Sequence, residues 1–246
     1  MKAVRLQQRN TAMEPNSRLR RVLWTCIVFL TFIGVAVATR RTVVLLPVIL
    51  HGYQPMAPPS NAVAAQFVPL DDLFAHYPIL TLIHIIPGLL FMILGPFQLS
   101  AGIRARYPKF HRVNGRIFLA CAAIVGISAL AMSFGMPAIG GVNQATATTL
   151  FATFFLFALG NALWHIRRRE IGLHRQWMIR AFATGLAVAT IRPIIGFFFA
   201  TSRITGLTPH EFFGTAFWLG FTLQLIVAEA WIHYTQPAAQ PTQPRP

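Results

Sequence analysis

Two ten-residue segments carry histidine and arginine at matching positions, which makes them the first candidates for chemistry. The segments IRARYPKFHR, at 103–112, and IRRREIGLHR, at 166–175, share Ile, Arg, Arg, His and Arg at the same five positions. Fewer than one identity is expected by chance in about ten aligned residues of ordinary composition. The sequence therefore predicts an internal repeat that places His111 and His174 at equivalent points of two membrane hairpins.

The chemistry that such a pair of histidines performs best is the ligation of a b-type haem. Two imidazoles on facing helices bind the iron from opposite sides, and nearby cations bind the propionates. The residues assigned to haem b in this interpretation are His111 and His174 as metal ligands, with Arg112, Arg116, Arg175 and Arg180 beside them. The alternative is that each histidine braces its loop and each arginine only marks the cytoplasmic side of the membrane.

A second pair of basic side chains, His84 and Arg192, falls inside the apolar segments. A charge at the bilayer centre costs at least ~3 kcal/mol, so it normally faces the bundle and has a partner. This pair predicts a pocket for a small anionic or quinone-like ligand in the outer half of the membrane. In the alternative interpretation, backbone carbonyls and Gln224 or Asn161 satisfy Arg192.

The acids are too few to pair with every cation. Glu229 is the only acid predicted inside a span, and it is expected too near the inner end to reach Arg192 easily. Asp71, Asp72 and Glu211 are expected at the outer mouth of the bundle. This scarcity disfavours proton- or sodium-coupled transport, which usually requires intramembrane acids.

The composition is that of a membrane protein. Of the 246 residues, 55% are hydrophobic and 11% are charged, and the mean hydropathy is +0.56. A soluble domain of this length has less apolar and more charged surface. The net charge of +15 does not indicate a nucleic-acid partner, because no basic domain with interleaved aromatic residues lies outside the apolar segments. The expected partner is the lipid bilayer.

The hydropathy pattern predicts an all-α bundle of six spanning helices, because about 20 apolar residues cross the hydrocarbon core. The predicted spans are Val22 to Ala38, Tyr77 to Ser100, Ile117 to Phe134, Ala147 to Ile166, Ile179 to Ala200 and Phe212 to His233. Lys and Arg divide 17 to 3 between the two sides, and the remaining one is Arg192. The positive-inside rule therefore predicts that both termini and both repeat segments are cytoplasmic.

The segments outside the spans are also interpretable. Residues 1–21 form a basic cytoplasmic tail, residues 22–233 form the bundle, and the Pro/Gln-rich residues 234–246 are expected to be disordered. The run from Val43 to Leu50 is too short to cross and contains a proline, so we expect an interfacial or re-entrant piece. The loop from His51 to His76 is the best candidate for an ordered external element.

Several of these motifs resemble a known family. The stretches GPFQ at 95–98, HRVNGR at 111–116 and HRQWMIR at 174–180, with His84 and Arg192, are similar to bacterial predicted membrane proteins grouped as domain of unknown function 2306. The resemblance covers Phe74 to Gly196, and Val113 and Asn114 replace the Trp-Leu of the usual motif. It implies a multi-pass bundle in the bacterial inner membrane and implies no activity.

Three classes of function follow from the sequence. The first is electron transfer through haem or a quinone at His111 and His174, and the second is small-molecule transport or binding at His84 and Arg192. The third is a structural or assembly factor without a ligand. No phosphate-binding loop, dinucleotide fingerprint, nucleophile elbow or His-Glu-x-x-His motif is present, which disfavours hydrolysis and phosphoryl transfer. Whether the protein is an enzyme is left open.

Overall fold

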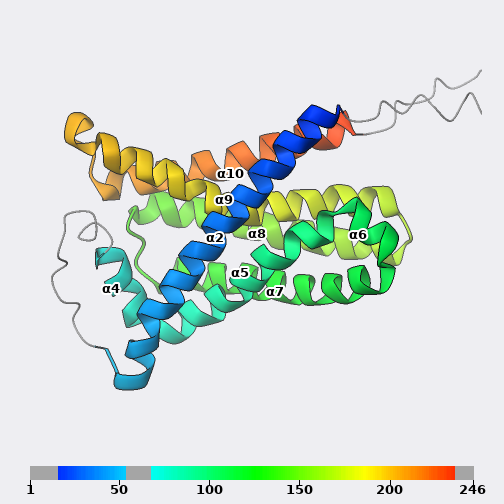
Figure 1. The fold of residues 1–246 in the computed structure, drawn as a ribbon. Helices are drawn as coiled ribbons and strands as arrows, with labels where there is room; N and C mark the ends of the chain where they lie inside the picture. Colours follow the sequence, from blue (N-terminus) through cyan, green and yellow to red (C-terminus); the bar gives the residue numbers. More distant parts are fainter. Residues whose placement is uncertain (1–15, 54–67, 236–246) are drawn as a thin grey trace, which may run out of the picture.

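The computed structural model describes residues 16–53 and 68–235, and all regular structure in these ranges is α-helical (Figure 1). The helices are α2 (Ser17–His51), α4 (Val68–His76), α5 (Pro78–Leu99), α6 (Ala101–Arg106), α7 (Pro108–Gly135), α8 (Gly141–Arg167), α9 (Ile171–Thr205) and α10 (Pro209–Tyr234). Six of them, all except α4 and α6, are long and apolar enough to cross a membrane. The prediction of an all-α protein with six spans is confirmed.

The spanning helices form one bundle. Helix α5 packs on α7, α7 on α8 and α8 on α9, while α10 covers α8 and α9. Helix α2 crosses obliquely over α5 and α9 (Figure 1). The two described chain ends meet at one end of the bundle, where the backbone N–H of Asn16 donates to the hydroxyl of Tyr234 at 3.1 Å. Helix α4 lies at the opposite end, which we call the α4 end.

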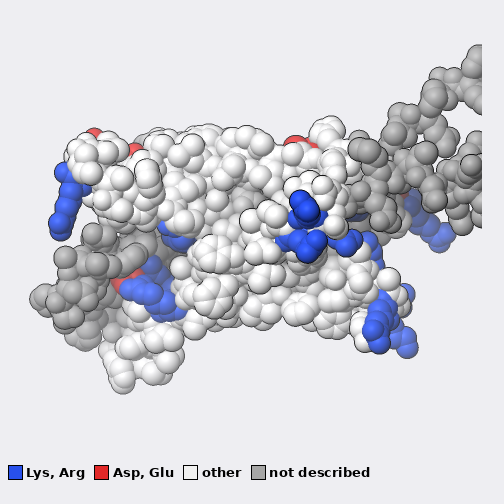
Figure 2. Space-filling model, turned by 45° about the horizontal axis from the view of Figure 1, so that its top comes forward, with Lys and Arg blue, Asp and Glu red and all other residues white. Residues whose placement is uncertain are grey.

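Lysine and arginine gather toward the two ends of the molecule, with a mostly uncharged surface between them (Figure 2). This distribution matches a protein whose middle is solvated by hydrocarbon. Many large apolar side chains are exposed in the spans, including Phe32 on α2 and Ile127 on α7. In a membrane protein such side chains are solvated by lipid.

Phenylalanine fills the centre of the bundle. Phe91 of α5 stacks on Phe118 of α7 at 4.6 Å between ring centroids, and meets Phe155 of α8 edge-on at 5.8 Å. Glycines permit this close packing, because a Cβ on Gly95 would lie 2.0 Å from the ring of Phe182. Van der Waals contact of this kind holds membrane helices together, since lipid tails are as apolar as the side chains.

The run from Val43 to Leu50 is not a re-entrant piece, because helix α2 continues without a break through it to His51, and its position at the membrane interface stays a prediction. Two residues of this helix, Arg41 and Leu45, are buried, and Arg41 bonds Asp71 of α4. They share one helix face because they are four residues apart. The packing of this face stabilises the helix across Pro47, whose missing N–H costs one backbone hydrogen bond.

The two copies of the ten-residue segment begin helices in the same way. Tyr107 and Glu170, which are equivalent in the repeat, precede α7 and α9 as N-cap residues. Each carbonyl accepts the N–H of the histidine four residues later, at 3.0 Å for both His111 and His174. Similarity of the two complete hairpins stays a prediction. The predicted tails at 1–15 and 236–246, and part of the external loop at 54–67, lie outside the described residues.

Candidate functional site: a cavity inside the bundle

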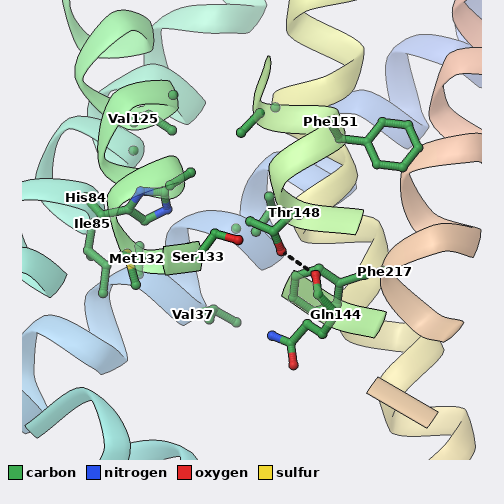
Figure 3. A pocket seen from close by; sticks show the side chains of 18 of the residues that line it. Val37, His84, Ile85, Val125, Met132, Ser133, Gln144, Thr148, Phe151 and Phe217 are labelled. Carbon is green, nitrogen blue, oxygen red and sulfur yellow. Dashed lines mark hydrogen bonds between the residues drawn. The ribbon is translucent and has the colours of Figure 1, made fainter. Parts of the chain in front are cut away.

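A cavity of about 270 Å³ lies inside the bundle toward the α4 end, and all six spanning helices and α4 contribute to its wall. Most of the wall is apolar. Its phenylalanines are Phe74, Phe91, Phe151, Phe155, Phe217 and Phe221. Figure 3 shows Phe151 and Phe217 on one side of this space and His84, Ile85 and Met132 on the other. A mostly apolar wall with a few polar groups is typical of small-molecule sites.

The polar residues of the wall are Arg41, His84, Ser133, Gln144, Thr148, Thr184 and Arg192. Both members of the predicted intramembrane pair, His84 and Arg192, therefore line one cavity. The hydroxyl of Thr148 donates to the backbone carbonyl of Gln144 at 2.9 Å (Figure 3). The Gln144 side-chain oxygen accepts the N–H of Gly140 at 2.8 Å. These bonds fix the backbone where α8 enters the cavity wall.

The imidazole of His84 is oriented by one neighbour on α7. The Ser128 hydroxyl donates to the carbonyl of Ile124 at 2.6 Å, and its oxygen lies 2.9 Å from Nδ1 of His84. We assign the single hydroxyl proton to the shorter bond, to Ile124, and Nδ1 of His84 then donates to Ser128. In the neutral ring Nε2 then keeps a lone pair. His84 is therefore a hydrogen-bond acceptor at Nε2.

Arg192 donates no hydrogen bond and forms no ion pair with any residue in the described ranges. The two partners proposed for it are engaged elsewhere: Gln224 donates to the hydroxyl of Thr190 at 2.7 Å, and Asn161 donates to the carbonyl of Phe157 at 2.9 Å. The guanidinium is also near enough to Arg41 to repel it electrostatically. The cavity therefore contains a cation with unfilled hydrogen-bonding capacity.

Arg41 has the partner that Arg192 lacks. Asp71 of α4 accepts two hydrogen bonds from Arg40, at 2.6 and 3.0 Å, and another from Arg41. Arg41 also lies over the ring of Phe74, 4.4 Å from its centroid. Asp71 and Arg41 are 4% and 5% exposed, so this is a buried ion pair at the α4 end of the cavity. The sequence placed Asp71 at the outer mouth but did not identify its partners.

The two repeat histidines lie at the opposite end from α4, near enough to interact electrostatically. Nδ1 of His174 donates to the carbonyl of Ala162 at 2.8 Å. Nε2 of His111 lies 3.5 Å from the side-chain nitrogen of Gln98, and its Nδ1 is buried without a hydrogen-bond partner among the described residues. The structure thus brings the two imidazoles into one region.

A haem does not fit between them without rearrangement. The space between α7 and α9 is filled by one continuous cluster that contains Phe118, Ala122, Met178, Ala181 and Phe182, each at most 7% exposed. Gly115, one turn after His111, leaves no space either, because the Gln98 amide lies 2.8 Å from where its Cβ would be. The small-residue faces serve close packing here, so we derive no chemistry through haem.

A family model described as predicted membrane protein, domain of unknown function 2306, matches residues 81–232. The chain belongs to this family. No curated protein and no solved structure matches it. Within the family region lie His84, His111, His174 and Arg192, whereas Arg41 and Asp71 lie before it. Arg192, which has no partner among the described residues, therefore belongs to the family region, whereas the Arg41–Asp71 pair belongs to the segments that precede it.

The arginines assigned to haem propionates have other positions in this family member. Arg180 donates through Nε and Nη2 to the two carboxylate oxygens of Glu229, at 2.6 and 2.8 Å. Arg175 donates to the hydroxyl of Thr235 at 3.1 Å. Arg112 and Arg116 are exposed. The Arg180–Glu229 pair was missed, although Glu229 was recognised as the one acid inside a span.

Proposed function

We propose that this protein binds a small amphipathic molecule inside the membrane, with the polar end of the molecule at Arg192 and His84. The observation that carries the proposal is a largely apolar cavity of about 270 Å³ whose wall includes a guanidinium without a partner among the described residues. An apolar wall binds the body of such a ligand, and the few polar groups orient it. Arg192 supplies donors, while Nε2 of His84 supplies an acceptor.

Two ligand classes satisfy this chemistry at the level of hydrogen bonding. A quinone offers carbonyl oxygens to Arg192, and a small anion offers charged oxygens. Members of either class that carry an apolar or aromatic body match the phenylalanines of the wall. The proposal therefore names a site and a kind of molecule, and it includes both classes.

Binding or passive transfer is favoured over ion-coupled transport. The cavity wall contains no Asp or Glu among the described residues. Glu229 is the described acid that was recognised inside a span, and it is bonded to Arg180. Coupled carriers use intramembrane carboxylates to bind the driving proton or sodium ion. With both termini cytoplasmic, as the charge distribution predicts, the cavity lies in the outer half of the bacterial inner membrane.

Paired substitutions on α7 test the proposal. Ala129 lines the cavity and Ala131, two residues later, is exposed. Phenylalanine at position 129 should fill the cavity, whereas the same change at position 131 adds a side chain in lipid. The probes are 4-butylbenzoate and 2-butyl-1,4-benzoquinone, added to protein in lipid nanodiscs and followed by thermal unfolding. A ligand at about 100 times its Kd stabilises its protein by about 2.7 kcal/mol.

We expect at least one probe to stabilise the wild type and Ala131→Phe, and neither probe to stabilise Ala129→Phe. Equal stabilisation of both variants would place binding outside the cavity and overturn the proposal. The haem alternative has its own test, which is a spectrum of the purified protein with and without dithionite. A reducible Soret band that disappears in both His111→Ala and His174→Ala would establish haem and replace the present proposal. Failure of every ligand would favour a structural or assembly factor.

A further inference from the structure

Positively charged side chains outnumber negatively charged ones around the cavity. Its described wall contains Arg41 and Arg192 but no carboxylate. Asp71 bonds Arg41 at the α4 end. The same carboxylate also bonds Arg40, whose side chain is half exposed. Arg192 lies near enough to repel the guanidinium of Arg41. The cavity is thus a site of positive potential with one cation left over.

The protein offers no acid for this cation among the described residues, because each of the five described acids has another partner. Asp71 bonds Arg40 and Arg41, Asp72 bonds Tyr53, Glu170 bonds His165, Glu211 caps α10 at Thr208, and Glu229 bonds Arg180. An isolated charge in the membrane is unfavourable by several kcal/mol unless something compensates it. A bound anion would supply the charge that the described protein omits.

We infer that the ligand of this cavity is a monoanion, specifically a carboxylate on an apolar body, and that Arg192 is the residue that selects its charge. This inference rests on the proposed function. A neutral quinone accepts hydrogen bonds from Arg192 but leaves the positive charge unbalanced. A dianion leaves its second charge without a counterion in the cavity, because Asp71 already bonds Arg41, and Arg40, which shares Asp71, is half exposed and does not line the wall.

The geometry of the donors favours a carboxylate. A guanidinium presents paired N–H groups that match two carboxylate oxygens, and such bidentate bonds are about twice as strong as neutral ones. The same arrangement occurs at two places among the described residues, Arg40–Asp71 and Arg180–Glu229. The Phe-rich wall beyond Arg192 then contacts the apolar body of the ligand.

Four probes of similar shape and different charge test the inference. They are 4-butylbenzoate, the neutral 4-butylbenzamide, the neutral 2-butyl-1,4-benzoquinone and the dianionic 4-butylphthalate. Their affinities are measured by calorimetry on the full chain in nanodiscs, with empty nanodiscs as the correction for lipid partitioning. We expect the benzoate to bind at least about tenfold more tightly than each of the other three probes.

Substitution of Arg192 assigns the preference to this residue. Arg192→Gln should abolish the preference for the benzoate over the benzamide, and Arg192→Lys should reduce it, because an ammonium keeps the charge but not the fork. Arg203→Gln is the matched control, because it removes the same charge from an exposed position on the same helix. It should bind all four probes as the wild type does. If Arg192→Gln does not fold, the comparison with Arg192→Lys carries the test.

The outcomes separate the two claims. If the benzamide, the quinone or the phthalate binds the wild type as tightly as the benzoate, or if both Arg192 variants keep the full preference, the inference is wrong and the proposed function stands. If no probe binds, or if Ala129→Phe binds all probes as the wild type does, the proposed function fails and the inference fails with it.

Discussion

The buried ion pair at the α4 end should make Asp71 one of the most sensitive positions for stability. In Asp71→Asn the guanidinium of Arg41, with a side chain only 7% exposed, loses its counterion. Removing one partner of a buried pair costs about 3–5 kcal/mol, because the other charge stays buried. Arg40 adds little, since its side chain is 49% exposed and exposed pairs contribute about 0–1 kcal/mol. The asparagine oxygen still accepts one hydrogen bond, so we expect the lower value, about 3 kcal/mol.

Thermal unfolding in detergent measures this loss. For a chain of this size, 1 kcal/mol corresponds to about 2–4 °C, so Asp71→Asn should lower Tm by about 6–12 °C. Arg40→Gln is the control and should lower Tm by no more than about 4 °C. Replacing Arg41 by Met and Asp71 by Leu together should recover most of the loss, because neither charge of this buried pair remains. If Asp71→Asn is no more destabilising than Arg40→Gln, the pair is solvated and the reasoning is wrong.

Three further predictions concern packing, a second ion pair and orientation. Gly95→Ala should lower stability by about 1–3 kcal/mol, because its Cβ would lie 2.0 Å from the Phe182 ring. The control, Gly160→Ala, has nothing within 4 Å and should be neutral or stabilising by up to about 1 kcal/mol, and thermal unfolding compares the two variants. Glu229→Gln should lower stability by about 2 kcal/mol by the same measurement, because Arg180 loses its bidentate acceptor, and no change in Tm would refute this. Reporter fusions should report the outside at Pro137 and Thr208 and the cytoplasm at Lys109 and Gly172, and a reversal would contradict the charge argument.

The number and type of spans were predictable because the bilayer leaves the backbone few choices. Every N–H and C=O in hydrocarbon needs an internal partner, so a long apolar segment in a single chain of this composition forms a helix. The height of a residue along its spanning helix was also predictable, because a helix rises 1.5 Å per residue. Counting residues placed His84 and Arg192 in the same half of the membrane, and both line one cavity.

Rotation and lateral order of the helices were not predictable from the sequence. Depth alone allowed Gln224 or Asn161 as partners of Arg192, yet both are engaged by other atoms. It also gave no reason to pair Arg180 with Glu229. The role of the small residues was equally ambiguous, because a stripe of them on a helix either leaves a void or allows a large side chain from another helix to pack there. Phe182 occupies the space at Gly95, and Gln98 occupies the space at Gly115.

The position of Arg192 is best explained by comparison with Arg41 and Arg180, two other arginines of the described helices whose side chains are mostly buried. Arg41 and Arg180 each have a carboxylate within hydrogen-bonding distance, supplied by a different helix. The sequence therefore contains the means to neutralise a buried arginine and does so on both sides of the bundle. A purely structural Arg192 would gain the same stabilisation from a similar acid. The described wall of the cavity at Arg192 contains no carboxylate, so a ligand that brings a negative charge, as we propose, would stabilise this arginine.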